Sequence, residues 1–202
     1  MCSSDLSDFS NPRKSGIIAI KLDNGDFLVG AGVTNGSNDV VLVSNGGKAV
    51  WFDENDVRSM GRNARGVRGM KLLEGQQVLS LLIASSDEES VLVATENGYG
   101  KRTVLSEFRK SGRGTQGVKA IQVSERNGIV VAAKLVGDHD EIMLITTGGV
   151  LIRTRVSEIR ELGRATQGVT LINLSKEEKL SGIEKIVETD HIDDDGQDEL
   201  PI

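Results

Sequence analysis

Arginine recurs inside a short glycine-bounded phrase that stands three times in this chain. The phrase is clearest at Gly163-Arg164-Ala165-Thr166-Gln167-Gly168-Val169, and it stands earlier at 112–118 and 61–67. Both intervals are 51 residues, and a weaker copy, Arg13-Lys14-Ser15-Gly16-Ile17, lies about 50 residues before the first. A guanidinium is a permanent cation that suits phosphate, and the N–H groups of glycine-rich loops add phosphate contacts. The phrase therefore predicts one anion-binding group presented repeatedly on a fixed scaffold.

Further basic residues cluster around each copy of the phrase. The three sets are Arg58, Arg62, Arg65, Arg68 and Lys71; Lys101, Arg102, Arg109, Lys110, Arg113 and Lys119; and Arg153, Arg155, Arg160 and Arg164. Two positions of the repeat hold arginine in all three sets, namely Arg58, Arg109 and Arg160, and Arg62, Arg113 and Arg164. A curved belt of cations suits the bending of a DNA duplex, because phosphate charge runs along its whole length. The competing interpretation is that these are ordinary solvated surface residues, and composition alone leaves both open.

The segments between these phrases are short apolar runs separated by turns such as Asn45-Gly46-Gly47 and Asn97-Gly98. Asn-Gly between apolar runs is the strongest short-range signal for a β-hairpin. The expected strands are 17–22, 27–33, 40–44, 48–52, 67–72, 78–84, 91–95, 101–105, 118–123, 129–136, 142–146, 150–156, 169–174 and 180–187. This is about four strands per repeat, with no helical periodicity. The predicted fold class is all-β, with four-stranded blades arranged radially in a propeller-like fold.

Charge is divided unevenly along the 202 residues, whose formal net charge is −6. From Lys176 onward there are ten acids and three bases, which leaves 21 bases against 20 acids in the body. The single cysteine excludes an internal disulfide and favours a reducing, cytoplasmic setting. No apolar run approaches the length of a membrane span, so no membrane association is expected.

Signals for catalysis, metal binding and nucleotide binding are weak. Trp51 and Phe52 are expected to pack, Tyr99 lies in a hairpin turn, and His139 is expected in an exposed turn. The cysteine and two histidines have no zinc-like spacing, and the chain contains no phosphate-binding Gly-x-x-x-x-Gly-Lys-Ser/Thr loop. The sequence therefore predicts no catalytic residue and no metal site.

Several phrases resemble the C-terminal domain of the A subunit of bacterial DNA gyrase. They are 52–62, 66–69, 97–103, 125–128, 153–159 and the arginine phrase at 163–169. The match runs from about Phe9 to Glu188. The paralogous topoisomerase IV subunit is similar in plan but is a poorer match in these phrases.

The resemblance implies a β-pinwheel, a propeller-like disc whose blades exchange strands, with roughly three to four blades present here. It implies sequence-nonspecific binding and wrapping of duplex DNA at a basic perimeter, in support of ATP-dependent negative supercoiling by the full enzyme. By likeness, phosphate contacts are expected from Arg58, Arg62, Arg65, Arg68, Lys101, Arg102, Arg113, Arg153, Arg155 and Arg164.

The resemblance also implies partners and a location. The chain would work with the rest of the gyrase A subunit, and with the gyrase B subunit in a heterotetramer, in the bacterial cytoplasm and on the chromosome. It would not be an enzyme by itself and would hold no cofactor, because ATP and Mg²⁺ are used by other parts of the full enzyme. The family's Gln-Arg-Arg-Gly-Gly-type box and its catalytic tyrosine region do not occur in this sequence.

Three regions are expected along the chain. Residues 1–8 are expected to be a truncated or foreign leader, 9–189 a partial β-pinwheel DNA-binding domain, and 190–202 an acidic disordered tail. The tail is expected either to compete with phosphate for the basic rim or simply to aid solubility.

Other functions remain open on the residues alone. Alternatives are a propeller-type protein-interaction module and the C-terminal domain of the topoisomerase IV A-type subunit. A propeller enzyme ranks last, because no converging carboxylates or metal ligands are evident.

Overall fold

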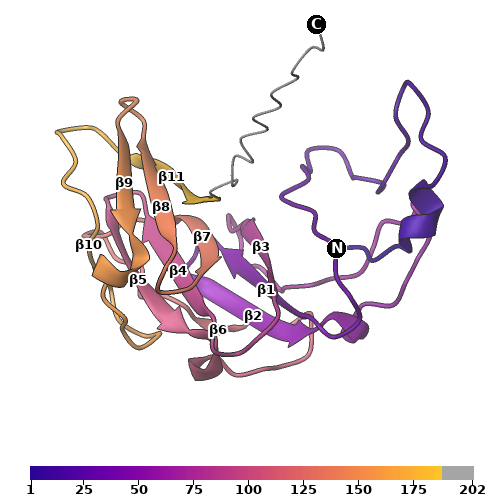
Figure 1. Cartoon of the computed structure of the whole chain (residues 1–202), viewed down its shortest axis with the longest axis horizontal. Helices are drawn as coiled ribbons and strands as arrows, with labels where there is room; N and C mark the ends of the chain where they lie inside the picture. The colour runs from indigo at the N-terminus through magenta and orange to yellow at the C-terminus, as the bar shows by residue number, and fades with distance from the viewer. Residues whose placement is uncertain (188–202) are drawn as a thin grey trace, which may run out of the picture.

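The computed structural model describes residues 1–187, which form three antiparallel sheets that follow one another across the molecule (Figure 1). The strands are β1 (Asp39–Ser44), β2 (Lys48–Asp53), β3 (Val78–Ala84), β4 (Ser90–Thr95), β5 (Tyr99–Val104), β6 (Val118–Lys119), β7 (Val130–Val136), β8 (Glu141–Thr146), β9 (Leu151–Arg155), β10 (Val169–Thr170) and β11 (Leu180–Ile186). Short 3-10 helices are η1 (Leu6–Phe9), η2 (Glu54–Asp56), η3 (Leu105–Glu107) and η4 (Val156–Glu158). No helix in this part of the chain is long and apolar enough to cross a membrane.

Each sheet is built on a tight hairpin that the sequence predicts from its glycine turns. The hairpins are β1–β2, β4–β5 and β8–β9, and each pairs on its inner side with β3, β7 or β11. In the first two sheets a two-residue strand from the next repeat covers the outer side, giving the orders β3-β1-β2-β6 and β10-β5-β4-β7. Among the described residues the third sheet has only β11-β8-β9. The exchange of strands between neighbouring repeats and the all-β blades confirm the predicted fold class.

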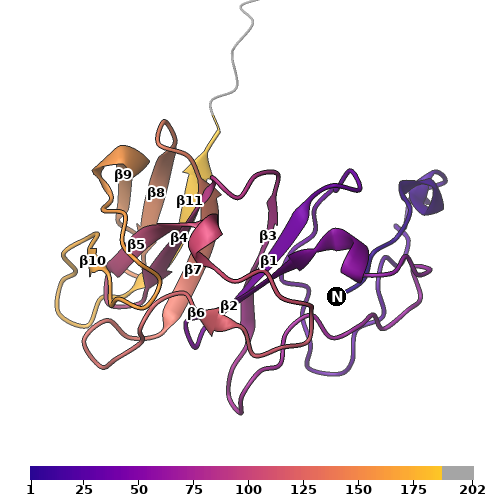
Figure 2. The same cartoon turned by 90° about the horizontal axis from the view of Figure 1, so that it is seen from below.

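Two main cores lie between neighbouring sheets, and β7 packs between β3 and β11 (Figure 2). The core between the first and second sheets includes Val41, Trp51, Val91 and Ile121. The core between the second and third sheets includes Leu92, Ile142, Ile172 and Leu180. Each core therefore contains an isoleucine from an exchanged segment, which ties the repeats together by apolar burial.

Three expected strands do not form, and two of them lie near the N-terminus. Residues 17–22 and 27–33 have no strand assignment, and Phe27 is 85% exposed. In the formed sheets, the strand equivalent to 27–33 pairs with the hairpin of its own repeat, as β3 does with β1. Among residues 1–187, no strand lies beside 27–33 to pair with it in this way.

The exchanged segments are shorter strands than the sequence predicts. The runs 118–123 and 169–174 contribute only β6 and β10, because the chain then turns over the hairpin end. The N–H groups of Ala120 and Ile121 both donate to the carbonyl oxygen of Gly47, at 2.8 and 3.2 Å. The equivalent run 67–72 contains no strand, although Val67 exchanges backbone hydrogen bonds with Met1 at 2.8 and 2.9 Å.

Candidate nucleic-acid interface

The glycine-arginine loops lie against the preceding repeat in a regular way. The N–H of Gly114 donates to the carbonyl oxygen of Gly69 at 2.6 Å, and that of Lys71 donates to Thr115 at 2.8 Å. One repeat later, the N–H of Gln122 donates to the carbonyl oxygen of Thr166 at 2.9 Å. Successive loops therefore lie side by side at the outer ends of the sheets, each held by backbone hydrogen bonds.

The last glycine of the phrase makes the close approach of loop and sheet possible. Gly117 has φ +70°, and a Cβ there would lie 2.1 Å from the carbonyl oxygen of Ala49. Gly168 has φ +82°, and a Cβ there would lie 2.6 Å from the carbonyl oxygen of Gly100. Only glycine meets both conditions, so these residues fix where the loop enters the sheet.

The arginine inside the phrase braces the loops. One terminal nitrogen of Arg62 donates to the carbonyl oxygen of Ile18 at 3.1 Å, and the equivalent nitrogen of Arg113 donates to Arg68 at 3.3 Å. Nε of Arg113 also donates to the carbonyl oxygen of Asp56 at 2.9 Å. A guanidinium has five N–H donors, so both side chains keep donors for an anion after making these contacts. The third member, Arg164, is half-buried.

A second arginine position is fully available at the surface. Arg58, Arg109 and Arg160 are all exposed, and each follows the 3-10 helix that leads out of its sheet. Among the described residues, none of the three guanidinium groups has an ion-pair or hydrogen-bond partner. Arg109 and Arg160 were not in the predicted set, although their register with Arg58 in the 51-residue repeat could have placed them there.

Two other predicted residues of the first loop are also exposed. Arg65 forms an ion pair with Asp23 at 3.2 Å, with both side chains largely in solvent. Arg68 offers its carbonyl oxygen to Arg113, while its side chain is exposed. An exposed ion pair of this kind is weak, so Arg65 remains available to an anion.

Lys101 lies where the sequence did not place it. The residue is fully buried in β5, and its ammonium donates to the carbonyl oxygen of Gly163. Burial lowers the pKa of Lys101 to about 8; nearby Glu107 opposes this change and Arg164 adds to it. In this structure the hydrogen bond from Lys101 holds the third loop against β5, and Lys101 is not one of the exposed cations.

Arg102 is likewise largely occupied within the protein. Its Nε donates to the carbonyl oxygen of Ile159 at 2.8 Å, it forms an ion pair with Asp138, and its side chain is only 13% exposed. The structure thus separates Lys101 and Arg102, which hold the second sheet to the third loop, from the surface arginines.

The remaining predicted pair lies on β9. Arg153 and Arg155 both project from the third sheet, and both form ion pairs with Glu141 of β8. The separation between Nε of Arg155 and Oε1 of Glu141 is 3.6 Å, and the Arg155 side chain is 71% exposed. These arginines lie on a strand, whereas the other exposed members lie on loops.

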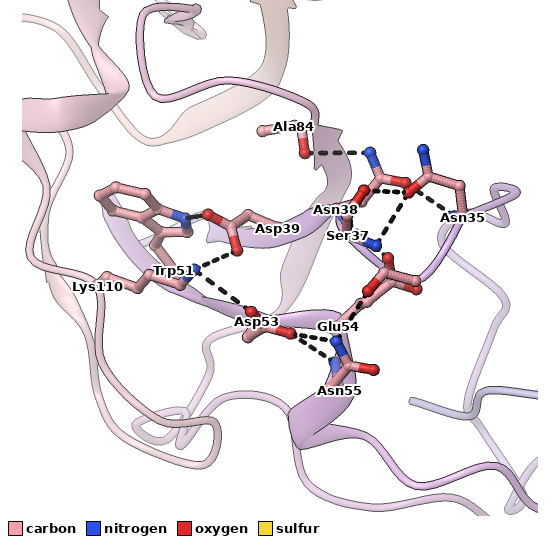
Figure 3. A network of polar contacts seen from close by, with 11 residues as sticks. Asn35, Ser37, Asn38, Asp39, Trp51, Asp53, Glu54, Asn55, Ala84 and Lys110 are labelled. Carbon is pink, nitrogen blue, oxygen red and sulfur yellow. Dashed lines mark hydrogen bonds and ion pairs between the residues drawn. The ribbon is translucent and has the colours of Figure 1, made fainter.

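A polar network absent from the prediction fixes the start of the second loop (Figure 3). The ammonium of Lys110 lies 2.6 Å from Asp39 and 3.6 Å from Asp53, and Nε1 of Trp51 donates to Asp39 at 2.8 Å. The hydrogen bond with Asp39 raises the pKa of Lys110, while hydrogen bonds from Asn55 lower the pKa of Asp53. The two carboxylates thereby compensate the positive charge of Lys110. The same contacts anchor the backbone next to Arg109.

The structure agrees with the sequence for Trp51, Phe52 and His139, whereas Tyr99 does not lie in the expected hairpin turn but begins β5. Trp51 and Phe52 pack in the interior, and His139 lies in an exposed turn. Tyr99 lies under the guanidinium of Arg126, 4.9 Å from the ring centroid, and hydrogen bonds with Arg126 and Thr170 lower the pKa of its hydroxyl. Within residues 1–187 no group of histidine, cysteine, aspartate and glutamate side chains is arranged to hold a metal ion.

A family model and individual relatives agree on the family that this chain resembles. The model of the DNA gyrase C-terminal domain, a beta-propeller, matches residues 3–35, 38–85, 89–136 and 140–186. The DNA gyrase A subunit of Pseudomonas aeruginosa is 52% identical over 190 residues, which is 94% of this chain and 20% of that protein. The DNA gyrase A subunit of Escherichia coli is 49% identical over 183 residues, covering 91% of this chain and 21% of that protein. The chain therefore spans about a fifth of the length of these curated relatives.

Solved structures agree with the sequence comparison. A structure of the DNA gyrase A C-terminal domain superposes with a TM-score of 0.78 at 32% identity, covering 86% of this chain and 59% of that one. A crystal structure of the C-terminal domain of DNA topoisomerase IV gives a TM-score of 0.85 at 31% identity, covering 91% and 57%. With four matched repeats and about half of its residues identical to those of gyrase A subunits, the chain belongs to the DNA gyrase C-terminal domain family.

Proposed function

We propose that this chain binds and wraps duplex DNA without sequence preference, as a non-catalytic C-terminal part of the DNA gyrase A subunit. In this role it supports ATP-dependent negative supercoiling by the full enzyme. The relatives that it matches are named as gyrase A subunits, and the chain corresponds to only about a fifth of their length. Cleavage of DNA and use of ATP and Mg²⁺ are therefore assigned to other parts of the enzyme, and the chain itself needs no cofactor.

The observation that carries this proposal is the exposed arginine at the same position of three successive repeats. Arg58, Arg109 and Arg160 follow successive sheets, and their guanidinium groups have no partner within the described residues. Unpaired cations at the same position of three repeats repel one another, and a bound polyanion removes this unfavourable interaction. A duplex that contacts all three must follow the curvature of the rim, since the sheets fan around the inner strands β3, β7 and β11.

The same arrangement favours phosphate contact over base readout. Most of the exposed cations lie on short loops anchored to the sheets, and residues 1–187 contain no α-helix that could enter a groove. Phosphate contacts position a duplex but do not specify its sequence. Bending a duplex costs a few kcal/mol, and contacts spread over several loops can offset that cost.

The partners follow from the family. We expect the chain to act beside the rest of the gyrase A subunit, and with the gyrase B subunit in a heterotetramer, in the bacterial cytoplasm and on the chromosome. The topoisomerase IV domain is the second candidate, because its TM-score of 0.85 is the higher of the two compared here. Gyrase is preferred because the curated relatives of highest identity compared here are gyrase A subunits.

Titration against a fluorescent duplex at several salt concentrations tests the proposal. Log affinity should fall linearly with log salt, by about 0.9 for each phosphate contacted, and a duplex of unrelated sequence should bind equally well. Neutralising the belt with Arg58→Gln, Arg109→Gln and Arg160→Gln should weaken binding and reduce that slope by about 3.

The matched control neutralises three lysines on or beside the inner strands. Lys134→Gln, Lys179→Gln and Lys185→Gln change the formal charge by the same amount but lie on β7, at the start of β11 and on β11. Their combined variant should keep the slope of the unaltered protein. Equal losses in both triple variants would mean that only net charge matters, and absence of binding at low salt would overturn the proposal.

A further inference from the structure

An acidic residue accompanies the exposed arginine in each of the three repeats. The 3-10 helices η2, η3 and η4 all end at an acid, and these acids are 51 residues apart, like the arginines that follow them. Each acid stands two residues before its arginine, and both are exposed in every repeat. The acid row is Asp56, Glu107 and Glu158, and the arginine row is Arg58, Arg109 and Arg160.

A buried residue between each acid and its arginine fixes the two rows relative to one another. Val57, Phe108 and Ile159 are 6%, 3% and 3% exposed. Each donates its N–H to the carbonyl oxygen that begins the 3-10 helix, at 3.0, 2.9 and 2.9 Å. Their backbone is extended, so the side chains on either side of each one point outward together. Two residues span at most about 7 Å, which is shorter than the screening length of about 10 Å at 0.1 M salt.

The acids of this row keep their charge at the surface. Within residues 1–187, the carboxylates of Asp56 and Glu158 have no ion-pair or hydrogen-bond partner. Glu107 accepts one long hydrogen bond from the N–H of Arg164, at 3.4 Å, and its charge acts on the buried ammonium of Lys101. None of the three acids forms an ion pair with the arginine two residues away. An approaching duplex therefore meets a negative row beside a positive one.

The turns next to the acid row are acidic as well. The first N–H groups of η3 and η4 donate to the carbonyl oxygens of Glu89 and Asp140, at 2.8 and 2.9 Å. The turns that contain these residues, 85–89 and 137–140, therefore lie against the acid row, and neither contains lysine or arginine. Asp138 and Asp140 are paired with cations, whereas Asp87 and Glu88 are exposed and have no partner in the described part of the chain.

On the other side of the arginine row the sign of the charge is reversed. The segments that begin at the buried residue and continue through the glycine-arginine loop are 57–73, 108–124 and 159–175. Together they contain 11 lysines and arginines and a single acid, Glu161. In each repeat the charge thus changes sign at the same residue, and the arginine row stands at the boundary.

We propose that the acid row repels the phosphates of a bound duplex and keeps the duplex on the loop side of the arginine row. This inference rests on the proposed binding of duplex DNA, and it assigns the path of the DNA to specific residues. Cations alone would hold a duplex in many orientations, because phosphate charge is the same along its whole length. Selection of one arrangement also needs interactions that disfavour the others. A duplex lying across the ends of the sheets would place phosphates beside the acid row and the turns 85–89 and 137–140.

Loss of the acid row should therefore strengthen binding and loosen the path of the DNA. The variant carrying Asp56→Asn, Glu107→Gln and Glu158→Gln keeps the shapes of the three side chains and removes their charge. Fluorescence anisotropy at low salt should show severalfold tighter binding of a short duplex, because repulsion of phosphate is removed. The circular dichroism spectrum should match that of the unaltered chain, since all three side chains are exposed.

Sealing of nicked circular DNA by a ligase measures the path itself. The change in linking number that remains after removal of the protein reports how consistently the bound molecules coil the DNA. At saturating protein the acid-row variant should produce about half the change made by the unaltered chain, or less, because a duplex with several paths is not bent in one direction. Saturation makes this comparison independent of affinity.

The matched control neutralises three acids at the opposite ends of the inner strands. Glu74, Glu125 and Glu177 are exposed, and they lie in the turns that precede β3, β7 and β11. The variant carrying Glu74→Gln, Glu125→Gln and Glu177→Gln alters the formal charge by the same amount and should keep the linking-number change of the unaltered chain.

The outcomes separate this inference from the proposed function. A full linking-number change in the acid-row variant, or an equal loss in both triple variants, would overturn the inference and leave DNA wrapping intact. Absence of any linking-number change with the unaltered chain would overturn the proposed wrapping, and the inference with it.

Discussion

At the scale of a single residue, burial of the charged ammonium of Lys101 costs free energy. Its pKa of about 8 lies below the ordinary value of 10.5, because burial disfavours the charged form. Between those two pH values the unfolded chain binds a proton that the folded chain has released. The free energy of unfolding must therefore rise as pH increases through this window, by at most about 3 kcal/mol.

Replacement of this lysine should remove that pH dependence. In Lys101→Met, the free energy of unfolding measured with urea should rise less between pH 8 and 10 than in the unaltered protein, since the titrating group is gone. At pH 7 the two effects of the change oppose each other. The cost of the buried charge disappears, but the carbonyl oxygen of Gly163 loses its donor, which costs about 1–3 kcal/mol.

The control for this prediction is an exposed lysine of the first loop. Lys71→Met removes a side chain that lies in solvent, so the rise of stability with pH should remain as in the unaltered protein. An undiminished rise in Lys101→Met would show that the ammonium is not the group responsible.

A comparison of equivalent positions in the repeat distinguishes buried, structural cations from cations at the surface. The positions equivalent to Lys101 are Val50 and Ile152, and two apolar equivalents predict a buried position. Likewise Arg58, Arg109 and Arg160 could be grouped from their spacing alone. By contrast, the ion pairs of Lys110 with Asp39 and Asp53 join residues 71 and 57 positions apart in the sequence, and no periodicity specifies such a contact.

At the scale of an element, the exchanged strand depends on the glycine that precedes it. Gly117→Ala would force a Cβ to within 2.1 Å of a backbone oxygen at φ +70°, whereas Gly112, in the same loop, has nothing within 4 Å. We expect Gly117→Ala to lower the free energy of unfolding by about 2–4 kcal/mol. Gly112→Ala should change it by no more than about 0.5 kcal/mol.

The single tryptophan provides the measurement for this pair of variants. Trp51 lies in the strand that receives β6, so its fluorescence follows unfolding of the sheet whose outer strand is disturbed. Equal stability of the two alanine variants would contradict the proposed role of Gly117 in placing the exchanged strand.

Strands were predicted well where both partners lie in one repeat and poorly where they do not. The hairpins and the strands β3, β7 and β11 begin and end within two residues of their expected limits. The runs 17–22 and 27–33 have the same apolar character but form no strand, because a strand needs a partner as well as a propensity. The sequence pattern predicts strand propensity, whereas the presence of a partner strand depends on how the repeats pack together.

At the scale of the whole molecule, charge separates the body from its end. The predicted acidic tail, 190–202, lies outside the described residues. Its acids are Asp190, Asp193, Asp194, Asp195, Asp198 and Glu199, and they account for the whole formal net charge of −6. The rest of the chain has no net formal charge. The acids of 190–202 therefore make the electrostatic potential around the exposed arginines more negative.

Deleting residues 190–202 should therefore tighten binding to duplex DNA at low salt by severalfold, measured by fluorescence anisotropy. The difference should shrink as salt rises, because screening at 0.1 M acts beyond about 10 Å. Replacing the six acids with their amides keeps the length of the segment and removes its charge, so this variant should bind as tightly as the deletion if electrostatic competition is the cause. Tightening by the deletion alone would instead point to exclusion of DNA by the volume of the segment. Unchanged affinity in both variants would mean that residues 190–202 do not affect DNA binding. Only charges near the exposed arginines would then affect it.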